Sequence, residues 1–278
     1  MRPLILITND DGYSSKGIRT LIEVAQEFGD VIVMAPETNA SAKGLSLTTE
    51  RPLRVRDVSG QWSALADGAP GDADGTAQLT TNHQPLTTPK VYACDGTPTD
   101  CLKLAYEHFC PRTPDLVLSG INHGSNSSIN VLYSGTMGAV LEATMLGCTA
   151  IGFSLLNHSP NADFKPCMPY VRHIVGMVLA KGLPANVALN VNIPRLPESE
   201  IKGIRVCRQA QARWVDSFER RTDPRGREYW WLTGKFDCPE PPQDTDEWAL
   251  ANGYVSVVPI QPDYTCREAI GQTQHLEL

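Results

Sequence analysis

Two adjacent aspartates, Asp10 and Asp11, have the side chains best suited to chemistry in this sequence. They follow a continuous apolar run at residues 4–7 and precede Gly12. Adjacent carboxylates repel each other unless a cation lies between them or one stays protonated. A turn at Gly12 would bring both carboxylates to one ion, and oxygen ligands favour Mg²⁺ or Mn²⁺. The alternative is structural: Asp10 caps a turn and Asp11 faces solvent.

Two neutral oxygen ligands could complete such a metal site. Ser41 lies in a polar stretch at residues 35–44, and Asn122 lies in another at residues 119–126. Two carboxylates balance one divalent ion, which lets a dianionic phosphate bind without strong repulsion. We therefore predict one divalent cation, held by the two aspartates with Ser41 and Asn122, that exchanges readily and is removed by chelators. Taken singly, Ser41 and Asn122 are more often ordinary turn residues.

A phosphate site is predicted where Ser134, Gly135 and Thr136 precede an amphipathic helical pattern. Free backbone N–H groups and the positive end of a helix attract anions, and two hydroxyls add donors. The amides of Asn126 and Asn9 could also donate hydrogen bonds to phosphate oxygens. The structural alternatives are helix capping by Ser134 or Thr136 and turn formation by the asparagines.

Other residues near these stretches have more than one interpretation. His123 could give a proton to a leaving oxygen or serve as a polar loop residue. Lys43 could steer phosphate, although a solvated surface lysine is the commoner case. Trp230 and Trp231 could stack a base, but interface packing is the better interpretation. The motifs GxxxxGK[ST], GxGxxG, GxSxG and HExxH are absent, which argues against several common nucleotide-binding and hydrolase designs.

The polar stretches follow apolar runs that alternate with helical patterns. Thr97 is the expected N-cap of one helix, with Pro98 at its first position and Asp100 at its third. The alternation predicts a Rossmann-like α/β fold, with a mostly parallel sheet, helices on both faces and ligands at the carboxyl ends of strands. Strands are expected at residues 4–7, 31–34, 91–94, 116–118, 150–153 and 187–191, and helices from about residue 17 and at 101–109, 137–147 and 170–179.

The C-terminal part shows a different, β-rich pattern. We predict a catalytic core at residues 1–202, whose last strand is at 187–191, and an arm and closing segment at residues 203–278. Asp223-Pro224-Arg225-Gly226 is a strong turn signal, so the strands beside it should pair as a hairpin arm that grips another subunit. The elements expected here are hairpin strands at 213–218 and 229–233, a helix at 247–251 and a strand at 254–258.

Residues 59–89 interrupt the core pattern. This stretch is rich in Gly, Ala, Asp and Thr and lacks strong periodicity. We predict a surface excursion, partly hairpin and partly mobile.

The composition excludes several classes of protein. The 278 residues are 41% apolar and carry a net charge of −7, which gives no general reason to bind a DNA duplex, whereas a single nucleotide stays compatible. No apolar stretch approaches the roughly 18 residues of a membrane span. The eight cysteines form no CxxC pairs, so we predict reduced thiols in a cytoplasmic protein without cysteine-bound zinc.

The motifs together resemble those of the SurE family, the survival-protein nucleotidases. Their order and spacing make the resemblance specific, and it spans nearly the whole chain. The matching stretches are ITNDDGYSSKGI, MAPETNASAKGLSLT, GTPTDCLKLA and LVLSGINHGSNSSINVLYSGTMGAVLEA, followed by RQAQARW, EYWWLTG and GYVSVVPIQP.

The resemblance implies a 5′-nucleotidase that often also acts on nucleoside 3′-monophosphates and sometimes on short polyphosphate. It implies dimers or tetramers that exchange C-terminal segments, in agreement with the predicted arm. It implies a single divalent metal at Asp10, Asp11, Ser41 and Asn122. It implies phosphate binding near Asn9, Asn126 and the turn of Ser134, Gly135 and Thr136.

Two departures from the family pattern bear on function. Lys43 stands where the family usually has a small or neutral residue, which bears on phosphate affinity and pH response. The excursion at residues 59–89 is longer than usual, which bears on access to the site. Neither departure touches the proposed metal ligands.

The main hypothesis is a one-metal phosphomonoesterase acting on nucleoside monophosphates. One of the two catalytic aspartates, Asp10 in preference to Asp11, would orient or deprotonate the attacking water, while Asn126, Ser134 and Thr136 stabilise charge on the phosphate. A rival mechanism forms an aspartyl-phosphate, but such enzymes usually separate their aspartates by one residue. A rival of another class is a non-catalytic nucleotide sensor or assembly protein.

Overall fold

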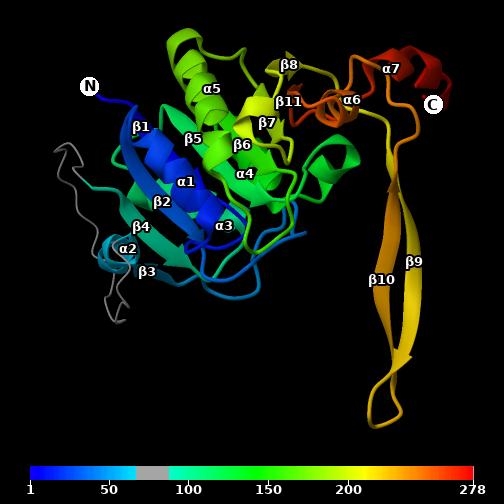
Figure 1. Cartoon of the computed structure of the whole chain (residues 1–278), viewed down its shortest axis with the longest axis horizontal. Coiled ribbons are helices and arrows are strands. Elements are labelled where there is room, and N and C mark those ends of the chain that lie inside the picture. Colours follow the sequence, from blue (N-terminus) through cyan, green and yellow to red (C-terminus); the bar gives the residue numbers. More distant parts are fainter. Residues whose placement is uncertain (67–87, 278) are drawn as a thin grey trace.

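A nine-stranded sheet forms the centre of the protein, as seen in a computed structural model that describes residues 1–66 and 88–277 (Figure 1). Six neighbouring strands at its centre run parallel, and two further strands, at residues 55–57 and 255–260, pair antiparallel with the two ends of this parallel set. The predicted mostly parallel, Rossmann-like sheet is therefore confirmed. In spatial order the strands are β3 (Val55–Asp57), β4 (Lys90–Cys94), β2 (Asp30–Pro36), β1 (Leu4–Thr8), β5 (Leu116–His123), β6 (Ala150–Leu155), β7 (Ala188–Ile193), β11 (Val255–Ile260) and β8 (Ile204–Val206).

Helices cover both faces of the sheet, as predicted. Because side chains alternate along a strand, Ile5 and Ile7 enter one hydrophobic core with residues of α1 and α5, while Leu4 and Leu6 enter another with α3 and α4. The helices are α1 (Lys16–Ala25), α2 (Ser59–Ala66), α3 (Pro98–Leu104), α4 (Gly135–Met145), α5 (Met168–Lys181), α6 (Asp246–Ala251) and α7 (Arg267–Thr273).

The start of α3 follows the sequence prediction closely. Thr97 is the N-cap, Pro98 opens the helix, and the Thr97 and Asp100 side chains each accept a hydrogen bond from the other residue's backbone N–H. The α-helix ends earlier than the predicted residue 109, because Ala105–Phe109 continues as a wider π-helical turn.

Several elements differ from the predictions. Residues 187–191 are not the end of the sheet: β11 and β8 extend it, because Val255 and Val257 are buried in the same core as β7. Two strands from beyond residue 202 thus belong to the central sheet. The helix α4 is not amphipathic, since residues 135–144 are all buried. In the predicted excursion, residues 59–66 form α2, and residues 67–87 lie outside the described residues.

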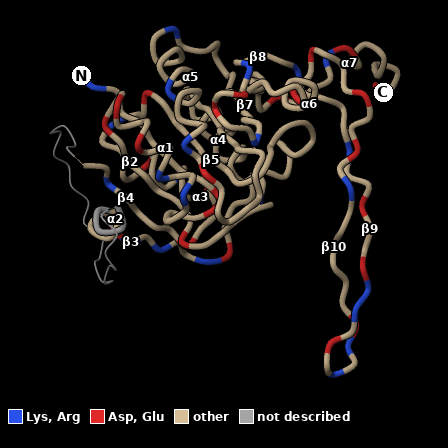
Figure 2. The backbone as a smooth tube through the Cα atoms, viewed as in Figure 1, with Lys and Arg blue, Asp and Glu red and all other residues tan. Residues whose placement is uncertain are grey.

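The C-terminal hairpin is confirmed and is longer than expected. Its strands, β9 (Arg213–Thr222) and β10 (Glu228–Asp237), pair antiparallel with each other and project from the body (Figure 1). Basic and acidic positions are interspersed along it (Figure 2). We call residues 213–237 the arm.

The described residues contain no helix with the length and apolar character needed to cross a membrane. All eight cysteines are free.

Candidate functional site

The predicted site residues come from three loops at the carboxyl ends of β1, β2 and β5. One pocket of about 620 Å³ is lined by side chains from all three loops. The parallel order β2-β1-β5 explains this convergence, because the ends of adjacent parallel strands lie at the same edge of the sheet. The predicted residues that line it are Asp10, Ser41, Asn122, Asn126 and Ser134.

Asp10 lies at the centre of these contacts and is 3% exposed. Its Oδ1 accepts a hydrogen bond of 2.6 Å from the Thr136 hydroxyl, and its backbone carbonyl accepts one of 2.7 Å from the N–H of Ala40. Burial raises the pKa of Asp10 to about 6; the Thr136 hydrogen bond lowers it and the neighbouring Asp11 raises it. A carboxylate in these surroundings would gain stability from a cation.

Asp11 joins the first loop to the third. Its Oδ2 accepts a hydrogen bond of 3.1 Å from the backbone N–H of His123. Burial raises the pKa of Asp11, and this hydrogen bond opposes the rise. Asp11 does not itself line the 620 Å³ pocket, so the two aspartates differ in their access to it.

The donor set fits a weakly held hard cation. Among the described residues, no group of three or more His, Cys, Asp or Glu side chains could hold a metal. Any metal would therefore rely on the two aspartates and on neutral oxygens. The amide nitrogen of Asn122 donates a hydrogen bond of 2.9 Å to the Gly124 carbonyl. The side-chain oxygen of Asn122 is therefore the atom able to bind a metal. Ser41 is exposed on its loop, and its backbone N–H donates to Asn39.

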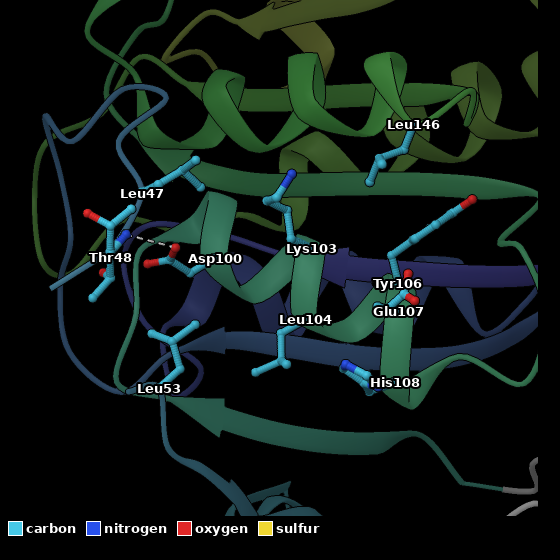
Figure 3. A pocket seen from close by; sticks show the side chains of 11 residues that line it. Leu47, Thr48, Leu53, Asp100, Lys103, Leu104, Tyr106, Glu107, His108 and Leu146 are labelled. Carbon is cyan, nitrogen blue, oxygen red and sulfur yellow. Dashed lines mark hydrogen bonds between the residues drawn. The ribbon is translucent and has the colours of Figure 1, made fainter. Parts of the chain in front are cut away.

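The loop that carries Ser41 is attached to α3 by two side chains. The Thr48 N–H donates a hydrogen bond of 3.0 Å to Asp100, and the Thr97 hydroxyl donates one of 2.7 Å to the Ser46 carbonyl. Figure 3 shows the first of these contacts at the edge of a separate pocket of about 420 Å³. The helix cap thus also fixes the far end of the loop.

The α4 N-terminus contains the helix cap that the sequence offered as the structural alternative to phosphate binding. Ser134 is the N-cap, and its hydroxyl accepts a hydrogen bond of 3.0 Å from the Met137 N–H. Gly135 packs between Asp10 and Pro98, where a Cβ would lie 3.0 Å from the Asp10 Cβ. The Thr136 hydroxyl faces Asp10 rather than the open pocket. This helix end therefore orients a carboxylate as well as offering backbone N–H groups.

The two asparagines predicted to bind phosphate are already hydrogen-bonded. The Asn9 amide donates to the Gly12 carbonyl and to the Ser15 hydroxyl, at 3.0 and 2.9 Å, so it serves the turn before α1. The Asn126 amide donates a hydrogen bond of 2.8 Å to the Ser154 hydroxyl. Asn126 lines the pocket, whereas Asn9 is completely buried and does not.

The hydrogen bond from Thr136 to Asp10 gives a test of this arrangement. We expect Thr136→Val to raise the pKa of Asp10 further, because the bond stabilises the charged form. In the pH–stability profile measured in EDTA, the fall in the free energy of unfolding between pH 4 and pH 7 should then be larger than in the wild type. Thr136→Ser keeps the hydroxyl and should retain the wild-type profile. Identical profiles for all three proteins would contradict this role of Thr136.

His123 and Lys43, for which the sequence left two interpretations each, have different surroundings. The His123 ring lines the pocket and packs edge-on against Phe164, with centroids 4.8 Å apart, and burial lowers its pKa. Lys43 is exposed and lines a different pocket of about 410 Å³ on its loop.

Sequence reasoning missed several residues of the pocket. Some lie between the predicted residues of the loops after β2 and β5, while the others depend on how the arm and the loop after β6 fold back, which no local spacing reveals. Trp214 was overlooked in favour of the Trp230-Trp231 pair, although the pocket is lined by Trp214. The missed lining residues are Ala42, Ser125, Asn130, Tyr133, His158, Trp214, Asp216, Leu232, Thr233 and Gly234.

A mostly parallel sheet with polar side chains gathered at the ends of β1, β2 and β5 defines a Rossmann-like protein with a small-ligand site at that edge. The chain belongs to the family described as Survival protein SurE, whose profile matches residues 5–216.

Relatives named 5′-nucleotidase SurE match nearly the whole chain. It is 51% identical to the 5′-nucleotidase SurE of Christiangramia forsetii over 269 residues, which are 97% of this chain and 95% of that protein. It is 47% identical to the 5′-nucleotidase SurE of Flavobacterium psychrophilum over 277 residues, which are 100% of this chain and 98% of that protein. The crystal structure of the SurE protein from Aquifex aeolicus superimposes with a TM-score of 0.78 at 35% identity, covering 99% of this chain and 100% of that one.

Proposed function

We propose that this protein is a divalent-metal-dependent phosphomonoesterase that hydrolyses nucleoside monophosphates to nucleoside and phosphate. The relatives named 5′-nucleotidase SurE support the reaction. The single observation that carries the proposal is the pocket in which Asp10, Asn122 and Ser134 meet. The groups that line this pocket are those that hydrolysis of a phosphate ester requires. They are a carboxylate to receive a proton, oxygen ligands for a cation, and a helix N-terminus for an anion.

One Mg²⁺ or Mn²⁺ per subunit would be held by Asp10, Asp11, Ser41 and Asn122. Such an ion supplies charge neutralisation for the phosphate and makes water more acidic. Asp10 would orient the attacking water and take its proton. The hydrogen bond from Thr136 holds the Asp10 carboxylate for this task. Backbone N–H groups at the start of α4, together with Asn126 and Ser134, would stabilise charge on the phosphate oxygens during in-line attack.

A phosphate-release assay tests this function directly. Purified protein is incubated with Mg²⁺ or Mn²⁺ and a panel of nucleoside 5′- and 3′-monophosphates and short polyphosphate. We expect phosphate release that stops on addition of EDTA and returns when excess metal is added, because two carboxylates hold the ion weakly. Release that resists EDTA, or no release from any substrate, would contradict the proposal.

Two rival functions predict different products. An aspartyl-phosphate mechanism would leave a trapped phosphoryl group on Asp10 or Asp11, detectable as a mass increase after acid quenching. A nucleotide sensor would bind nucleotides without releasing phosphate. No contact in the pocket favours either rival over attack by water, and the named relatives are enzymes.

We further propose that the chain forms a dimer or tetramer through the C-terminal segment, residues 203–278. The arm supports this, since its apolar side chains are exposed in the single chain, and each exposed aromatic group favours association. The exposed large side chains of the arm that do not line the 620 Å³ pocket are Val215, Phe218, Tyr229, Trp230 and Trp231. The mixed charges of Figure 2 give no support to binding of a DNA duplex. The free cysteines support a cytoplasmic location.

A further inference from the structure

One wall of the 620 Å³ pocket is supplied by the base of the arm. Trp214 and Asp216 of β9 line it together with Leu232, Thr233 and Gly234 of β10. The same pocket is lined by Asp10, Asn122 and Ser134, where phosphate is proposed to bind. A pocket of this volume accommodates a whole nucleoside monophosphate. With the phosphate at the sheet edge, the pocket residues left to contact the nucleoside would include those of the arm.

Trp214 is held in a fixed orientation. Its indole N–H donates a hydrogen bond of 2.8 Å to Asn130, and its ring packs edge-on against Phe236, with centroids 5.6 Å apart. The side chain is nevertheless 44% exposed. Because its single donor is already used, what Trp214 offers to a ligand is a flat aromatic surface. Such surfaces stack on nucleobases at little entropic cost.

Asp216 differs from the other acidic residues of the arm. Within residues 213–237, all of which the structure describes, Glu219, Asp223, Glu228 and Asp237 each form an ion pair with an arginine. Asp216 has no ion pair or side-chain hydrogen bond to any described residue. A carboxylate kept unpaired in a pocket wall is available to accept hydrogen bonds from a ligand.

The strand geometry places these two side chains for joint use. Residues i and i+2 of a strand share a face and lie roughly 7 Å apart, so Trp214 and Asp216 lie side by side. Asp216 pairs across the hairpin with Gly234, where a Cβ would lie 3.4 Å from the Asp216 Oδ1 and would crowd the carboxylate. A base stacked on the indole would therefore present its edge to the carboxylate.

We propose that Trp214 and Asp216 form a nucleobase subsite that favours guanine. The proposal rests on the nucleotidase function proposed above. Guanine presents two adjacent N–H donors, N1–H and the N2 amino group, which a carboxylate accepts as a charge-assisted bidentate pair. Hypoxanthine presents one of these donors. Adenine places the N1 lone pair beside its amino group, which opposes a carboxylate. The expected order of kcat/KM is GMP, then IMP, then AMP.

Kinetic constants of full-length variants test the subsite. We expect Asp216→Asn to lower the GMP-to-AMP ratio of kcat/KM roughly tenfold or more, because a carboxamide offers one acceptor and one donor. We expect Trp214→Ala to raise KM roughly tenfold for every nucleotide, with Trp214→Phe in between. Ribose 5-phosphate, which has no base, should be hydrolysed at the wild-type rate by all of these variants.

A matched control is Glu219→Gln, which removes one charge from the same strand, on the face opposite to Asp216. It should leave the GMP-to-AMP ratio unchanged. An unchanged ratio in Asp216→Asn would overturn the base assignment. An equal loss with ribose 5-phosphate would also overturn it, because the carboxylate would then contact the sugar or act on the fold.

Failure of the subsite can be told apart from failure of the proposed function. If wild-type protein releases no phosphate from any monophosphate, the nucleotidase proposal fails. Calorimetry with EDTA-treated protein then decides the subsite: tighter binding of GMP than AMP that is lost in Asp216→Asn supports it. Equal affinities for the two nucleotides in wild-type protein would contradict it.

Discussion

Replacing Asp10 with asparagine is expected to remove nearly all phosphate release and, at the same time, to stabilise the metal-free protein at neutral pH. The activity should fall at least about 100-fold, because the variant would lose both the proposed cation ligand and the proposed acceptor of the proton from water. The amide oxygen can still accept the hydrogen bond from Thr136, so the helix end should keep its position. The two effects have opposite signs, which a general folding defect would not produce.

The gain in stability follows from the raised pKa of Asp10. Its pKa is about 6 in the folded protein against an ordinary value of 3.8 for an aspartate, so the folded state favours the neutral carboxyl. Below pH 3.8 the group is protonated in both states and makes no difference. Between pH 3.8 and 6 its ionisation increasingly favours unfolding, and above pH 6 the cost is complete, at about 3 kcal/mol. Asparagine carries no charge at any of these pH values and avoids that cost.

Urea denaturation in EDTA at pH 7 and pH 4 measures this difference. The variant should be about 3 kcal/mol more stable than the wild type at pH 7 and nearly equal to it at pH 4. Glu23→Gln, which changes an exposed carboxylate on α1, should match the wild type at both pH values. If the Asp10 variant has the wild-type stability at pH 7 or hydrolyses nucleotides at the normal rate, the assignment of Asp10 is wrong.

The loss of activity and the gain of stability expected for Asp10→Asn have one physical cause in the fold. The sheet edge buries a carboxylate beside a second one, and a cation would offset this cost when it binds. The proposed reactive group, Asp10, thus lies in surroundings that disfavour its charge. Stability is commonly lower at such sites because the function needs the strained arrangement.

Local signals in the sequence were sufficient for much of the fold. The buried parallel strand β1 is a continuous apolar run, and the cap formed by Thr97 and Asp100 can be read from residue types alone. The turn of the arm was equally plain from Asp223 and Gly226. These features depend on residues only a few positions apart in the sequence, so a short segment is enough to predict them.

The remainder depends on contacts between distant residues. The residues around Val255 and Val257 predict a strand. No local signal shows that this strand pairs with β7, from which the arm separates it in the sequence. The burial of α4 on all sides depends on Gly138, where a Cβ would lie 2.3 Å from the Gly44 carbonyl oxygen, and a single glycine does not reveal that approach. Trp214 was missed as a pocket residue for the same reason.

Gly17 is a further case in which the distant contact decides the outcome, and its substitution should have a large effect. Glycine to alanine within a helix normally stabilises by up to about 1 kcal/mol. At Gly17, however, the added Cβ would lie 1.9 Å from the backbone carbonyl oxygen of Ile121 in β5. A backbone atom cannot turn aside as a side chain can, so α1 and β5 must move apart. Such overpacking costs about 1–3 kcal/mol and occasionally more.

We therefore expect Gly17→Ala to destabilise the protein by at least about 2 kcal/mol and to lower Tm by several degrees. The same displacement would lengthen the hydrogen bond from the His123 N–H to Asp11, since Asp11 precedes α1 and His123 ends β5. The apparent affinity for Mg²⁺ should then fall together with Tm. Gly271→Ala in α7, where no described atom lies within 4 Å of the new Cβ, should change stability by less than about 1 kcal/mol. A more stable Gly17→Ala protein with unchanged Mg²⁺ affinity would show that the packing of α1 on β5 does not position the site.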